Sequence, residues 1–179
     1  MAEAFINQVN RAVGIVTSSS NASIGVGLTW MSGISTAHVA INDLVDNANF
    51  IAGTKVTFVG VSSVQLDRAS TNTTAATSSN VSFLGPTTSY TSASATKSIL
   101  IGGTFANNTA NSVNLTVTVY DNSATTESQL AAKIPVPTGS SFVISDAGKT
   151  VLEGDDEVRV YCDTENAIDV NLSILKGVS

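Results

Sequence analysis

Three stretches in the second half of the chain alternate apolar and polar residues at almost every position. They cover residues 113–120, 157–163 and 168–174. Because successive side chains of a β-strand point to opposite faces, each stretch is predicted to bury one row of side chains and to expose the other. Nothing comparable at helical spacing competes with these stretches. Together they predict an antiparallel sheet with one buried face.

The same half of the chain holds further short strand-like runs. Turn residues separate them, with Asn107-Asn108-Thr109 and Asp121-Asn122-Ser123 as the clearest cases. The pattern predicts an antiparallel β-sandwich over residues 97–179, of immunoglobulin-like or jelly-roll topology. A domain of about 85 residues buries a modest share of its surface, so oligomerisation would help to stabilise it. The predicted strands are 97–105, 113–120, 129–134, 141–144, 150–152, 157–163 and 167–175.

A smaller β module is predicted over residues 15–86. Its clearest element is a hairpin in which the strand 54–59 turns at Gly60 into the strand 61–67. A strand at 81–84 precedes Gly85-Pro86, a pair that breaks regular structure. The Ser/Thr/Ala-rich residues 71–79 are predicted to form an exposed loop of this module.

Two segments lie outside these predicted domains. Residues 87–96 lack an apolar row and are predicted to form a linker. Residues 1–14 are predicted to form an N-terminal arm, in which Phe5, Val9 and Val13 are spaced four apart. That spacing permits one or two turns of helix, and the segment suits a strand equally well. The arm could dock on a neighbouring subunit or add an edge strand to its own domain, so these three residues are possible interface residues.

Composition narrows the functional classes. Only 12% of the 179 residues are charged, below the usual quarter, and the net charge is −6. An acidic chain without a Lys/Arg cluster argues against a nucleic-acid partner. No run approaches the length needed to span a bilayer, and the first residues do not resemble a secretory signal. The lone Cys162 falls on an apolar row and is interpreted as a small buried side chain, which suits folding in a reducing cytosol.

The residues that could carry chemistry are few. His38 is the only histidine, in the strand-like run 35–41, and no Gly-x-Ser-x-Gly elbow accompanies it. The acids between Glu153 and Glu157 are adjacent on a short turn, so they would not face each other across a cleft. A solvated turn is favoured there over a calcium site. One Cys and one His serve zinc poorly. We therefore predict no enzyme activity, no catalytic residue, no metal and no cofactor.

Aromatic residues offer a second class of contact. Trp30 lies between apolar residues, which favours a position in the core, with a carbohydrate platform as the alternative. Tyr120 and Tyr161 lie on the polar rows of their predicted strands. If another subunit covers that sheet face, these two tyrosines are possible interface residues; otherwise they are half-exposed strand residues.

Two regions of the chain resemble known β modules. Residues 44–56, followed by 64–70, resemble a small β module of phage fibres and accessory virion proteins. The region from 97–101 to 151–158, with Leu-Glu-Gly-Asp before its strand, looks like sandwich domains of phage structural proteins. The long repeats of a full fibre shaft are absent, so a short accessory protein matches better.

The resemblance implies a non-enzymatic virion protein that is assembled in the host cytoplasm. It would form a homo-oligomer and bind other phage structural proteins at the neck or tail, without a nucleic-acid or membrane partner. The alternatives are a capsid decoration (cement) protein and a glycan-binding adhesin module that attaches to the host. In the adhesin, Trp30 would contact the glycan.

Overall fold

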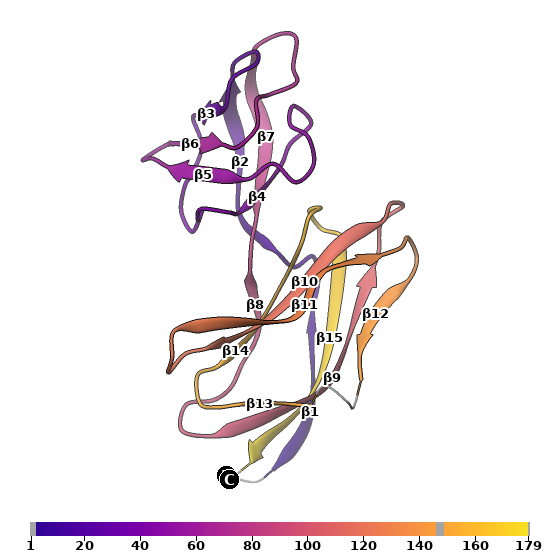
Figure 1. Cartoon of the computed structure of the whole chain (residues 1–179). Helices are drawn as coiled ribbons and strands as arrows, with labels where there is room; N and C mark the ends of the chain where they lie inside the picture. Colours follow the sequence, from indigo (N-terminus) through magenta and orange to yellow (C-terminus); the bar gives the residue numbers. More distant parts are fainter. Residues whose placement is uncertain (1–2, 146–148, 179) are drawn as a thin grey trace. The chain divides into compact units, whose positions relative to one another are not determined.

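The structure is a computed structural model, and it describes residues 3–145 and 149–178. These residues form strands, turns and loops, with no helix among them. The predicted all-β class is therefore confirmed. The strands fall into two compact units, called unit 1 and unit 2 below (Figure 1).

Unit 2 is inserted into unit 1 in the sequence. Unit 1 takes the chain up to Val13, then Pro86–Cys162, and then the chain from Asn166 onward. Unit 2 takes Gly14–Gly85, together with the three residues Asp163–Glu165. The backbone N–H of Gly85 donates to the carbonyl of Gly14 at 2.9 Å, so the two ends of the insertion lie side by side. The N-terminal segment thus belongs to the same unit as the C-terminal strands.

One sheet of unit 1, called sheet A, contains five antiparallel strands. Their order is β1-β15-β9-β12, and β13 pairs with another part of β9. Sheet A places the first strand of the chain beside the last. The bounds are β1 Ala4–Asn10, β9 Lys97–Asn107, β12 Ser141–Ile144, β13 Thr150–Leu152 and β15 Ile168–Val178.

The second sheet of unit 1, called sheet C, has four antiparallel strands in the order β11-β10-β14-β8. The alternating stretches of the sequence supply β10 and β14 here and β15 in sheet A. Every strand that the pattern predicts in this half is present, with ends shifted by at most three residues. The bounds are β8 Thr87–Thr91, β10 Val113–Asp121, β11 Thr126–Val136 and β14 Glu157–Cys162.

The two sheets enclose one apolar core, which makes unit 1 a β-sandwich. Leu100, Phe105 and Leu172 of sheet A are fully buried, as are Leu115 and Val160 of sheet C. Cys162 lies in this core, as the apolar row predicts. The polar row of β10 is expected to be exposed to solvent, but Thr116 and Thr118 in that row are buried. Neighbouring strands cover that row, and Thr118 Oγ1 donates to Glu127 Oε1 at 2.5 Å.

Unit 2 contains one six-stranded antiparallel sheet with the order β4-β7-β2-β3-β6-β5. Its own core includes Met31, Val56 and Phe83. The predicted hairpin is present as β5 and β6, closed by the Gly60 N–H donating to the Ser63 carbonyl at 2.8 Å. The bounds are β2 Ile15–Ile24, β3 Trp30–Ser32, β4 Leu44–Asp46, β5 Val56–Val59, β6 Ser63–Leu66 and β7 Ala76–Leu84.

Three local expectations are wrong, and one open alternative is decided. Of the alternatives for the N-terminal segment, residues 4–10 form an edge strand of their own domain rather than a helix or a free arm, because β1 pairs with β15 over its whole length. Residues 87–96 are not only a linker, since they contain β8, which pairs with β14. The expected loop 71–79 includes the start of β7. The run 35–41 forms turns rather than a strand.

Two of the misjudged segments, 71–79 and 87–96, share a physical cause. Ser and Thr favour turns when judged locally, yet a neighbouring strand satisfies their backbone groups just as well. Tyr90 illustrates this in β8: it packs against the core of unit 1, and its hydroxyl hydrogen-bonds Ser98 Oγ at 2.8 Å. The neighbours of this ring come from other strands, so the local sequence does not reveal them.

Candidate interaction surfaces

The outer face of sheet A carries a row of apolar side chains that crosses four strands. Phe5 of β1 is paired with Leu175 of β15, Leu175 with Ile99 of β9, and Ile99 with Val151 of β13. Phe5 is 77% exposed and Val151 56%, whereas Leu175 and Ile99 are half-buried. We call these four residues the apolar row. A contiguous exposed apolar patch of this kind is typical of an interaction surface.

The structure separates the three possible interface residues of the N-terminal segment. Phe5 and Val9 lie on the outer face of β1, because residues four apart on a strand share a face, and Val9 is 62% exposed. Val13 lies beyond the end of β1 and is buried in the core of unit 1. Its N–H donates to the Ile168 carbonyl at 3.3 Å. Phe5 and Val9 are therefore available for contacts, and Val13 is a core residue.

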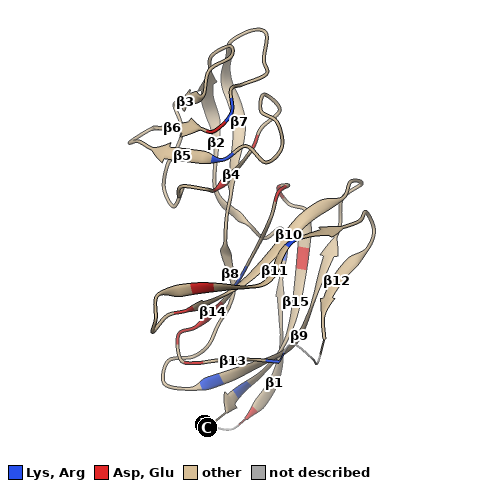
Figure 2. Ribbon diagram, in the orientation of Figure 1, with Lys and Arg blue, Asp and Glu red and all other residues tan. Residues whose placement is uncertain are grey.

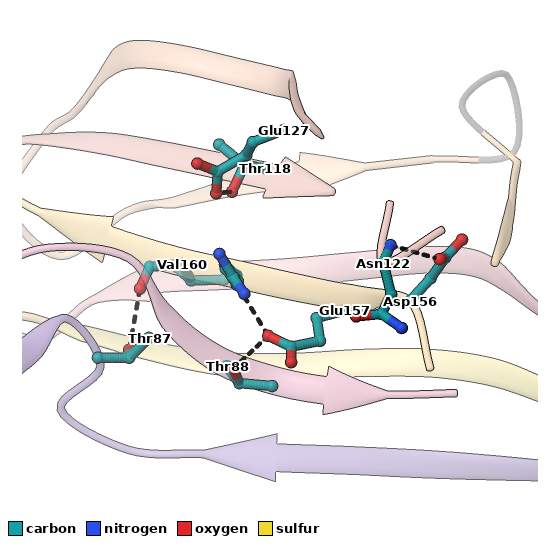
Figure 3. Close-up of polar contacts among 9 residues, drawn as sticks. Thr87, Thr88, Thr118, Asn122, Glu127, Asp156, Glu157 and Val160 are labelled. Carbon is teal, nitrogen blue, oxygen red and sulfur yellow. Dashed lines mark hydrogen bonds and ion pairs between the residues drawn. The ribbon is translucent and has the colours of Figure 1, made fainter. Parts of the chain in front are cut away.

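The outer face of sheet C is polar, and Glu157 lies on it at the start of β14 (Figure 3). Thr88 Oγ1 donates to Glu157 Oε2 at 2.7 Å, and Arg159 Nε donates to the same oxygen at 2.8 Å. Burial of the Glu157 carboxyl alone would raise its pKa. The hydrogen bonds from Thr88 and Arg159, together with the positive charge of Arg159, outweigh that effect and leave the pKa below its ordinary value.

The two tyrosines on this face have different surroundings. Tyr120 is half-buried, and the Arg159 guanidinium lies 3.8 Å from the centroid of its ring. This cation–π contact means that a residue of the same chain already covers one face of the Tyr120 ring. Tyr161 is half-buried and paired with Thr116 of β10. Sequence reasoning placed both tyrosines on the correct face but did not reveal the arginine above Tyr120.

The acidic turn before β14 is solvated in part, since Glu153 and Asp155 are exposed, but Asp156 in the same turn links two loops. Asp156 is only 4% exposed. Its Oδ1 accepts the Asn122 N–H at 3.0 Å, and its Oδ2 accepts the Glu153 N–H at 2.9 Å. This carboxylate therefore joins the loop after β10 to the loop after β13. Across the residues that the structure describes, no group of three or more His, Cys, Asp or Glu could hold a metal ion.

An exposed aromatic pair lies on the sheet of unit 2. Trp30 of β3 and Phe58 of β5 are both paired with Gln65 of the intervening strand β6. The two rings are 5.9 Å apart, with an interplanar angle of 62°, so they meet edge to face. Trp30 is 44% exposed and Phe58 50%, so the expected core position of Trp30 is wrong. We call these three residues the aromatic cluster.

Two further residues with possible chemistry lie in turns of unit 2. His38 is exposed and has a φ of 65°, in a turn rather than on a strand face. Asp43 is buried, and its Oδ2 accepts the Ala40 N–H at 2.7 Å, as expected of an aspartate that closes a turn. Burial raises the pKa of the Asp43 carboxyl more than that hydrogen bond lowers it.

Sequence reasoning missed most of these surface residues. Val151 stands in a three-residue strand, too short to show alternation, and Phe58 follows a register shift between β5 and β6. Ile99 lies in the mainly apolar run 99–101, where either face could have been the buried one. Only the cross-strand register shows that residues so distant in sequence share one face.

Comparisons with known proteins add little. No family model matches the chain, and no curated protein matches it. One solved structure is similar to it, the Arthrobacter globiformis T6 isomalto-dextranase complexed with panose, at 11% identity and a TM-score of 0.25. That match covers 97% of this chain and 34% of the other, so the chain spans about a third of that protein. A TM-score this low carries no argument about function. No helix among the described residues is long and apolar enough to cross a membrane.

Proposed function

We propose that this chain is a non-enzymatic structural protein of a tailed-phage virion that binds other virion subunits at the neck or tail. The observation that carries the proposal is the apolar row on sheet A, which presents Phe5 and Val151 to solvent. The resemblance of residues 44–70 and 97–158 to phage structural modules supports the virion context.

The mechanism is burial of this face against another subunit. Removing apolar surface from water contributes about 25 cal/mol per Å², and Phe5 and Val151 are the most exposed side chains of the row. The ion pair beside the row, Lys97 with Glu153, joins residues of the same chain. A partner can therefore cover the row without leaving an unmatched charge from this pair.

The first test locates the protein in phage particles. Gold-labelled antibody on purified virions should stain the neck or tail. Label spread over the head would favour the capsid decoration alternative instead. Absence of label, together with absence of the protein from dissociated particles, would contradict a virion role altogether.

A pair of variants tests the apolar row in the same particles. Val151→Glu should reduce incorporation at least tenfold, because a charge would be buried at the interface. Val61→Glu is the matched control, since Val61 is 99% exposed on a loop of unit 2 and should be incorporated normally. Equal incorporation of the two variants would show that the row does not bind the particle.

A second candidate function, a glycan-binding adhesin module, is favoured by the aromatic cluster. Trp30 and Phe58 present apolar ring surface beside the amide of Gln65, and sugars are bound by ring stacking combined with amide hydrogen bonds. A glycan array should give a signal with the wild-type protein that Trp30→Ala abolishes. Val61→Ala, in a loop of the same unit, is the matched control. Silence across the array would exclude this function for the glycans tested.

A further inference from the structure

Strand β1 leaves one edge of sheet A without a partner strand. It is the terminal strand of the sheet and pairs only with β15. The pairing runs from Ala4 opposite Lys176 to Asn10 opposite Val170 without a register shift. A regular edge strand presents a row of backbone N–H and C=O groups that can template another strand.

The other terminal strands carry the features that usually block such pairing. Strand β4 has three residues, and β5 has four and a register shift. Strand β8 also has a register shift, and β12 and β13 are short. Strand β11 contains Glu127, Lys133 and Pro135 and has two register shifts. Among the strands that the structure describes, only β1 is a terminal strand that is long, regular and uncharged.

The sequence of β1 is complementary to itself. In an antiparallel pair of β1 strands centred on Asn7, Phe5 of each copy lies opposite Val9 of the other. Both side chains are largely exposed and lie on the same outer face, so the pair would form two apolar cross-strand contacts. No charge lies between Ala4 and Asn10, although the chain has a net charge of −6 and charged positions mark both units (Figure 2). This is an edge where two identical copies meet without like-charge repulsion.

We propose that β1 pairs antiparallel with β1 of a second copy, which joins the two A sheets into one continuous sheet. The pairing adds backbone hydrogen bonds along the edge, as in β-strand addition. It also joins the apolar row of one copy, through Phe5, to Val9 of the next. The pairing does not depend on the virion role proposed above.

The interface is small, so the dimer is expected to be weak and concentration-dependent. A seven-residue strand is about 23 Å long at ~3.3 Å per residue. Such an edge buries far less than the roughly 800 Å² per partner of a stable complex. Sedimentation velocity over a concentration series should therefore show monomer at low micromolar concentration and dimer near millimolar concentration.

Paired charge variants test the edge. Phe5→Lys with Val9→Lys should be monomeric at every concentration, and so should Phe5→Glu with Val9→Glu, because like charges would face each other. An equimolar mixture of the two should form a dimer at least tenfold tighter than either variant alone. Circular dichroism checks that each variant keeps its strands, which is expected because both side chains point to solvent.

Val151→Lys distinguishes dimerisation through the β1 edge from packing of the outer faces of two A sheets. Val151 lies on the outer face of sheet A but on β13, away from β1, so this variant should dimerise like the wild type. Dimer loss in Val151→Lys would show face-to-face packing and overturn the proposal. A wild-type protein that stays monomeric near millimolar concentration would overturn it too, and a strand from another protein would then be the occupant to seek.

A cysteine variant tests the register. Asn7→Cys places two thiols opposite each other at the centre of the pair, so mild oxidation should give a covalent dimer. Ser173→Cys is the matched control, because Ser173 is paired with Asn7 on β15 and lies one strand further from the edge. It should remain monomeric. Equal cross-linking of the two variants would contradict the antiparallel register.

Discussion

Individual side chains on the outer face of sheet C are held by contacts that cross strands. Glu157 accepts hydrogen bonds from Thr88 on β8 and Arg159 on its own strand, and Arg159 in turn covers the Tyr120 ring on β10. These contacts join three adjacent strands through one carboxylate. Their contribution depends on the ionisation of that carboxylate, so it should vary with pH.

The Glu157 carboxylate should stabilise the fold most at neutral pH. Its pKa in the folded state lies below the ordinary value of 4.5, so the stabilisation is present above about pH 4.5 and is lost as the pH falls through the folded pKa. Glu157→Gln should therefore lower the urea midpoint at pH 7, and the difference from wild type should shrink by pH 3. Thr88→Val, which removes one hydrogen-bond donor, should show a smaller pH-dependent loss. An equal loss for Glu157→Gln at both pH values would contradict the assignment.

In strand β1, the alternation of side chains between the two faces determines which residues contribute to the core. Its inner side chains, such as Ile6, pack against the core of unit 1, and its outer side chains, such as Phe5, face solvent. The larger apolar residue is thus on the exposed side. Hydrophobicity alone would have ranked Phe5 as the more important residue for stability.

Substitution on the inner face of β1 should lower the unfolding free energy more than substitution on its outer face, although the outer face carries the larger apolar residue. Ile6→Asn should cost about 2 kcal/mol of unfolding free energy, because it removes partly buried apolar contacts and places an amide beside the core. Phe5→Asn should change the free energy by less than about 0.5 kcal/mol, as is usual for exposed positions. Urea unfolding measures both, at a low protein concentration where β1 does not pair with a second copy. A larger loss for Phe5→Asn would mean that the register of β1 is shifted by one residue.

At the scale of the whole molecule, the chain is one β-sandwich with a second β unit inserted after its first strand. The insertion begins at Gly14 and ends at Gly85, which are joined by a backbone hydrogen bond. Units whose ends lie close together can be inserted into a host domain with little disturbance of its fold. The two units also have separate cores.

Unit 1 should therefore fold without the insertion. Replacing Gly14–Gly85 by a short Gly/Ser linker should leave a protein with β-type circular dichroism and one cooperative thermal transition. A second chain that lacks residues 1–13 as well is the control. It loses β1 and Val13 and should unfold at a lower temperature. Failure of the first variant to fold would show that the two units depend on each other.

Much of unit 1 could be predicted from the sequence because the signal for its strands lies in residues a few positions apart. In β10, β14 and β15 the apolar residues alternate over several pairs of positions, and that period specifies both the strand and its buried row. Gly60 likewise identified the β5–β6 hairpin, because a tight turn acts over a few residues. The candidate surfaces were only partly predictable: Phe5 and Val9 were recognised, whereas Ile99, Val151 and Phe58 were not.

The amino-acid sequence by itself determined that the chain is all-β, where most strands of the sandwich lie, and that Cys162 is buried, because these properties depend on residues a few positions apart. Only the tertiary structure decided that β1 belongs with β15, that residues 87–91 form a strand, and that Trp30 is exposed. These depend on pairing between residues up to 172 positions apart, as in Ala4 with Lys176. Backbone hydrogen bonds hold such pairs whatever the side chains, so no local pattern records them.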